Sequence, residues 1–149
     1  MLSKLTLVVE RFIAKESQQL RNLPDVMITD GDSIRVGQLD ITLNGTKYIV
    51  SIGTEVIASF DNKSIAVCFA KGYPAAVTGL SYFNMLDKRV TKSKQDAFRY
   101  SSIVRANIAA KKYADADVFL DRLSEAQYVL NNTIYSAEQY NKRLLSTKY

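Results

Sequence analysis

The residues with the most evident chemistry in this sequence are lysines and arginines concentrated in one stretch. Between positions 88 and 112, eight basic side chains stand against a single acid, Asp96. They are Lys88, Arg89, Lys92, Lys94, Arg99, Arg105, Lys111 and Lys112. The formal charge of the whole chain is +5, so the rest of the sequence is close to neutral. A positive field confined to one stretch predicts a partner that carries phosphate groups or carboxylates.

A helix over residues 94–112, capped by Ser93, would arrange this charge as a stripe. At about 100° per residue, four side chains fall within about 40° of one another: Lys94, Phe98, Arg105 and Lys112. A turn before this helix would hold three more basic residues that can join the stripe: Lys88, Arg89 and Lys92. These seven residues are the predicted partner-binding residues.

Three interpretations of the stripe remain open. It is a solvated helix face whose long side chains cover apolar surface, a contact surface for an acidic protein, or a nucleic-acid surface. In the last case Phe98, Tyr100 or Tyr113 could stack on bases. No helix-turn-helix glycine, aromatic RNA-binding strand motif or zinc finger is present to favour nucleic acid.

Residue types that perform catalysis are scarce. The chain has no histidine, which removes the commonest general base and metal ligand. Its one cysteine, Cys68, lies in an apolar run and is predicted to be buried rather than nucleophilic. The acids of residues 25–32 lack the full spacing of a calcium loop. We therefore predict no catalytic, cofactor-binding or metal-binding residue, and no enzyme.

A second group of acids follows the basic stretch. Asp117, Asp121 and Glu125 are spaced i, i+4, i+8 and could line a magnesium site. Acids near the start of a helix are also what the helix dipole favours. A further possibility is that this acidic ridge pairs with the basic stripe of the same chain or of a second copy.

Tyrosine is abundant, with nine copies. Four of them gather toward the C-terminal end: Tyr128, Tyr135, Tyr140 and Tyr149. Tyrosine is enriched at interfaces because it offers a large amphipathic surface at low entropy cost. Asn131 and Asn132 are expected to break the helix between the first two, so no continuous tyrosine stripe is predicted.

Length and composition favour one globular domain over residues 1–149. No apolar run reaches the roughly 18 residues of a membrane span, and the N-terminal apolar cluster is too short for a signal peptide. We expect a location in the cytoplasm or within a viral particle, without secretion through a signal peptide.

The elements that must position these residues form an α+β fold. A helix is predicted over residues 2–20 and a turn over 25–33. Strands 39–43 and 46–52 form a hairpin around Asn44-Gly45, with Leu43 facing Thr46 and Ile41 facing Tyr48. Strands 55–60 and 63–70 form a second hairpin, in which Val56, Ala58 and Phe60 are expected to share the apolar face. Residues 33–38 are a candidate edge strand.

The remaining chain is predicted to be helical and to pack on the apolar face of this four- to five-stranded antiparallel meander. The expected helices cover residues 75–86, 94–112, 118–130 and 136–145. Val104 and Leu123 are among the residues predicted to face inward.

The sequence therefore predicts a non-enzymatic interaction or assembly protein. It would contact a protein partner, or itself, through the basic helix 88–112 and the tyrosine-rich C-terminal segment. The alternative is a nucleic-acid-binding module that uses the same helix. A small chain without a metabolic motif is also compatible with a phage or viral structural or accessory protein.

Overall fold

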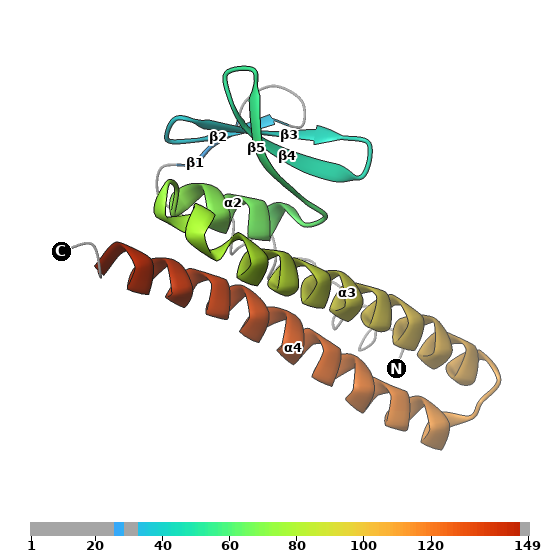
Figure 1. Ribbon diagram of the computed structural model, residues 1–149. Helices are drawn as coiled ribbons and strands as arrows, with labels where there is room; N and C mark the ends of the chain where they lie inside the picture. Colours follow the sequence, from blue (N-terminus) through green and yellow to red (C-terminus); the bar gives the residue numbers. More distant parts are fainter. Residues whose placement is uncertain (1–25, 29–32, 147–149) are drawn as a thin grey trace.

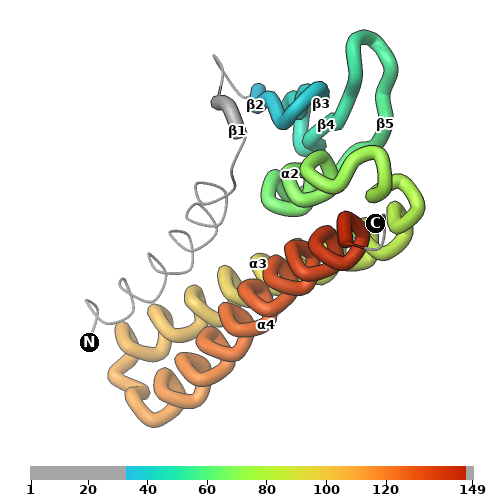
Figure 2. The backbone as a smooth tube through the Cα atoms, turned by 90° about the vertical axis from the view of Figure 1, so that its left-hand side faces the viewer, coloured from blue at the N-terminus to red at the C-terminus, as the bar shows by residue number. Residues whose placement is uncertain are grey.

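The computed structural model describes residues 26–28 and 33–146. Three layers follow one another: a β-sheet, one short helix, and a long helical hairpin (Figure 1). The hairpin extends well past the sheet and the short helix, which both lie toward one of its ends (Figure 2). The helix predicted over residues 2–20 falls outside the described residues.

The sheet has five antiparallel strands in sequential order, as the predicted meander requires. They are β1 (Val26–Ile28), β2 (Ser33–Val36), β3 (Leu39–Asn44), β4 (Lys47–Ile52) and β5 (Glu55–Phe60). Strand β1 lies where a turn was predicted, and β2 confirms a strand within residues 33–38. Its predicted place at the edge of the sheet is wrong, because β1 pairs with its outer side. One face is buried and consists of aliphatic and aromatic side chains: Ile34, Val36, Leu39, Ile41, Val50, Ala58 and Phe60.

The loops that connect β2, β3, β4 and β5 have the same length and the same position of glycine. Each has two residues with glycine first, and Gly37, Gly45 and Gly53 all have φ near +60°. The predicted loop at Asn44-Gly45 is therefore wrong by one position. Leu43 pairs with Tyr48 rather than Thr46. The β3 residues each pair two positions further along β4 than predicted. A shift of two residues leaves every side chain on its predicted side of the sheet, so the predicted inward face is preserved.

Strand β5 contains an irregularity that changes which of its side chains face the core. Val50 pairs with Ala58 while Ser51 pairs with Val56, which leaves Ile57 as an extra residue. Such a bulge interrupts the alternation of side chains. Ala58 is buried as predicted, whereas Val56 is 63% exposed instead of facing inward.

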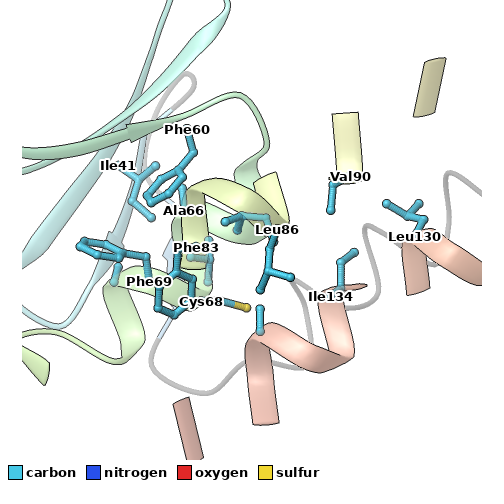
Figure 3. Packing of buried hydrophobic residues seen from close by; sticks show 14 of the residues in the cluster. Ile41, Phe60, Ala66, Cys68, Phe69, Phe83, Leu86, Val90, Leu130 and Ile134 are labelled. Atoms are coloured by element: carbon cyan, nitrogen blue, oxygen red, sulfur yellow. The ribbon is translucent and has the colours of Figure 1, made fainter. Parts of the chain in front are cut away.

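The segment predicted as the last strand, residues 63–70, is instead the helix α2 (Lys63–Lys71). All seven residues from Ser64 to Ala70 are buried, because α2 lies between the sheet and the hairpin. Phe69 links the layers (Figure 3), with its ring centroid 5.4 Å from Phe60 and 5.6 Å from Phe83. A helix that is apolar on every side is stable only when it is covered on every side.

Polar side chains from the hairpin hold both ends of α2. At its start, the Asp87 carboxylate accepts hydrogen bonds from the backbone N–H groups of Asp61 (2.8 Å) and Asn62 (3.0 Å). At its end, the Asn141 side chain donates to the carbonyl oxygen of Cys68. An acceptor therefore meets the N–H end of the helix and a donor meets its carbonyl end, as the helix dipole favours.

The hairpin consists of two unbroken helices, α3 (Leu80–Ala109) and α4 (Tyr113–Ser146), preceded by a short 3-10 helix, η1 (Ala75–Gly79). The predicted turn over residues 88–92 and the predicted break at Asn131-Asn132 are both wrong. Neither helix contains proline or glycine. Ser93 was predicted to cap a new helix and residue 136 to begin another. The hydroxyls of Ser93 and Ser136 instead donate to the carbonyls of Arg89 and Asn132 within the continuous helices.

Buried apolar residues of varied size at seven-residue spacing join the two helices. On α3 they are Phe83, Val90, Ala97 and Val104, and on α4 they are Ala116, Leu123, Leu130 and Ala137. This heptad spacing is typical of a coiled-coil seam. The predicted inward positions Val104 and Leu123 are confirmed.

Candidate partner-binding groove between α3 and α4

The continuity of α3 divides the predicted binding residues between two sides of the helix. Around the helix axis, Lys92 lies about 120–160° and Lys88 about 80–120° from the row formed by Lys94, Phe98 and Arg105. The predicted turn that would have let them join one stripe does not exist. Lys112 lies outside α3, in the loop that leads to α4.

The first side of α3 borders a groove of about 730 Å³ between the two helices. From α3 it is lined by Lys88, Arg89, Lys92, Ser93, Asp96 and Tyr100, and from α4 by Arg122, Glu125, Ala126 and Val129. Three predicted site residues thus meet a fourth cation, Arg122, which sequence reasoning missed. Arg122 is remote in sequence and becomes a neighbour only because α4 folds back along α3.

Charge in the groove is mixed but predominantly positive, with four cations and two carboxylates. Within residues 33–146, none of the four cations is in an ion pair. Asp96 is paired at 3.4 Å with Arg99, one turn further along α3. The acidic ridge therefore does not neutralise the groove, and only Glu125 of that ridge lines it.

Stacked aromatic and guanidinium groups lie at the Tyr100 wall of the groove. The ring centroids of Tyr100 and Phe119 are 6.0 Å apart. The guanidinium of Arg99 lies 5.0 Å from the Tyr100 ring centroid, and that of Arg122 lies 5.4 Å from the Phe119 centroid. These contacts restrict the aromatic side chains and orient Arg122 at the groove.

The opposite side of α3 has a different character. Phe98 is 63% exposed and Arg105 is also exposed, while Lys94 is half-buried. Phe98 and Arg105 lie in one row along the helix, two turns apart, and the exposed ring can stack on a planar ligand. The structure does not bring this row together with Lys88, Arg89 and Lys92.

The other acidic and thiol groups add no clear site. Asp117 and Asp121 are exposed on α4, and no group of three potential metal ligands occurs in the part of the chain that the structure describes. Cys68 is buried, and that burial raises its thiol pKa to about 12. Desolvation also raises the pKa of the Glu138 carboxyl, opposed by Lys142 and Lys71.

The C-terminal tyrosines separate into two groups. Tyr140 packs inward, with its ring centroid 4.6 Å from that of Tyr82. Tyr128 and Tyr135 are 69% and 56% exposed and, because α4 is continuous, lie on one face of it two turns apart. Tyr149 falls outside the described residues.

No family model, curated protein or solved structure matches this chain. None of the helices in the described ranges has the length and apolar character needed to cross a membrane.

Proposed function

We propose that this protein is a non-enzymatic interaction protein that holds an acidic segment of a protein partner in the groove between α3 and α4. The observation that carries the proposal is the convergence of four cations, none of them ion-paired within the described residues, on one groove. Arg89 and Arg122 present planar guanidinium groups that suit carboxylates in a bidentate geometry.

The lining of the groove favours a protein over a nucleic acid. Asp96 and Glu125 interrupt the positive surface, and a continuous phosphate backbone would be repelled by both. A peptide can place its carboxylates at intervals that avoid these two positions. Ala126 and Val129 also give the groove an apolar part, against which a peptide side chain can pack.

Nucleic-acid binding is the second candidate, and it belongs to the opposite side of α3. There the exposed ring of Phe98 and Arg105 lie in one row along the helix, two turns apart. An aromatic platform beside a cation suits an unpaired base and its phosphate.

The two candidates make opposite predictions for matched variants. We expect Lys92→Glu and Arg122→Glu to weaken binding of a fluorescent peptide rich in Asp and Glu by roughly tenfold, because each reverses a charge in the groove. Arg105→Glu is the control for net charge and should change this affinity little. Fluorescence anisotropy at low and moderate salt measures the affinity.

Labelled single-stranded DNA provides the competing probe. If nucleic acid is the partner, DNA binds more tightly than the peptide, its affinity falls steeply with salt, and Phe98→Ala and Arg105→Glu weaken it. Absence of peptide binding at low salt, or equal loss with Arg105→Glu and Lys92→Glu, would reject the groove as the binding site.

A further inference from the structure

The outer face of α4 carries a row of four exposed residues at seven-residue spacing: Asp121, Tyr128, Tyr135 and Lys142. The segment between residues 126 and 137 contains no charged residue at all. The row therefore passes from an acid, through two tyrosines, to a base. We call these four residues the α4 row.

The middle of the α4 row has the composition of a protein interface. Tyr128 and Tyr135 are more than half exposed, whereas Tyr140 packs inward against Tyr82. Asn132 is also exposed and lies between them on the same side of the helix. Exposed tyrosines in an uncharged surround are typical of contact surfaces rather than of solvated helix faces.

The order of residues in the α4 row makes it complementary to itself. Two α4 helices can lie antiparallel and cross at the midpoint between Asn131 and Asn132. Each residue before this midpoint then faces the residue that lies the same number of positions after it in the second copy. Tyr128 then faces Tyr135 of the second copy, and Asp121 faces Lys142 of the second copy. A parallel arrangement would instead place like charges opposite each other.

We propose that this protein forms a homodimer in which the α4 rows of two copies pack antiparallel around a two-fold axis. The interface is isologous, so every contact occurs twice. Arg122 and Val129 of the groove lie roughly 100° or more around α4 from Tyr128. Glu125 is the groove residue nearest the row, about 60° around the helix from Tyr128. The dimer contact uses none of the four groove cations, so either proposal can fail without the other.

Charge exchange tests the antiparallel arrangement. Asp121→Lys alone and Lys142→Asp alone each place like charges in both copies of the pair, and we expect each to weaken dimerisation roughly tenfold. An equimolar mixture of the two variants restores both pairs in a heterodimer. The double variant Asp121→Lys/Lys142→Asp restores them in a homodimer. Sedimentation equilibrium over a range of concentrations measures each dissociation constant.

The tyrosines provide a second measurement that does not depend on charge. We expect Tyr128→Ala and Tyr135→Ala to weaken the dimer, whereas Tyr113→Ala, at the other end of α4 and also exposed, serves as the matched control. Circular dichroism checks that helix content is unchanged. A wild-type chain that stays monomeric at every concentration overturns the proposal. A dimer that is insensitive to the tyrosines, or that fails to recover in the mixture, overturns it as well.

Discussion

Cys68 illustrates how the environment of a single residue decides its chemistry. The thiol lies in α2 between the sheet and the hairpin, where burial raises its pKa from an ordinary value of 9.0 to about 12. It is therefore protonated in the folded protein throughout the physiological range, and it is not a candidate nucleophile.

The same shift predicts how stability depends on pH. In the unfolded chain Cys68 loses its proton near pH 9, whereas in the folded protein it keeps the proton to about pH 12. Ionisation therefore favours the unfolded chain as pH rises above 9. We expect the stability advantage of the wild type over Cys68→Ala to shrink by about 1.4 kcal/mol between pH 8 and pH 10.

Denaturant titration of both proteins at the two pH values measures this difference. Comparison with Cys68→Ala removes the contributions of lysines and tyrosines that titrate in the same range. A constant difference between the two proteins would mean that the folded thiol ionises as easily as the unfolded one.

The groove shows what could be predicted at the level of single residues. Its α3 cations are adjacent in the sequence and were found from their local charge density. Arg122 could not be found in this way, because its position beside Lys92 depends on the antiparallel return of α4. A local pattern in the sequence predicts which charged residues lie close together on one helix. The full set of residues that line a groove also depends on which helix packs beside it.

At the scale of elements, the sheet was predicted more accurately than the helices. Strands β3 and β4 alternate apolar and polar residues around a glycine loop, and this pattern has few alternatives. The run from Ile65 to Ala70 is apolar at every position, so it fits a buried strand and a buried helix equally well. Only the layers above and below α2 decide between them.

Helix ends were misplaced because capping residues were given too much weight. Ser93 and the pair Asn131-Asn132 are typical of helix boundaries, but the heptad seam continues across both positions. Thr133, next to that pair, donates its hydroxyl to the carbonyl of Val129 at 2.7 Å and so remains compatible with the helix interior. Packing of the two helices thus outweighs local preference.

The connection between α2 and α3 depends on one buried carboxylate. Asp87 accepts from two backbone N–H groups and from the side-chain amide of Asn62 at 2.9 Å, and that amide also donates to Thr91 at 2.8 Å. We expect Asp87→Ala to lower the free energy of unfolding by roughly 2–4 kcal/mol, because it leaves the two backbone N–H groups of Asp61 and Asn62 without an acceptor. Asp87→Asn should cost less, since it retains one acceptor oxygen.

Urea denaturation measures both changes. Asn84→Ala, at an exposed position one turn earlier in α3, is the control and should alter stability by less than about 0.5 kcal/mol. A cost for Asp87→Ala no greater than that of the control would show that α2 does not need this carboxylate.

At the scale of the whole molecule, the hairpin is supported unequally along its length. Near the sheet, α3 and α4 pack against α2 through large side chains such as Phe83, Leu86 and Ile134. Toward the tip the hairpin extends beyond the other layers (Figure 2), and small side chains occupy several buried positions: Ser93, Ala97, Ser101, Ala116 and Ala126. Less apolar surface is therefore buried per turn at the tip.

This gradient predicts that the hairpin opens from its tip. Local opening costs less free energy where fewer apolar contacts are lost. We expect backbone amides of residues 97–125 to exchange with deuterium faster than those of 83–91 and 130–138, and Ala97→Gly to widen the difference because glycine weakens a helix interior.

The groove spans both regions, so an acidic peptide that binds it should slow exchange at Tyr100 and Arg122 more than at Phe83. Hydrogen-exchange mass spectrometry with and without the peptide measures this, at a protein concentration held constant because dimerisation through α4 would also protect residues near Tyr128. Uniform protection along both helices would mean that the tip is held as firmly as the base, and that the small seam residues pack as effectively as the large ones.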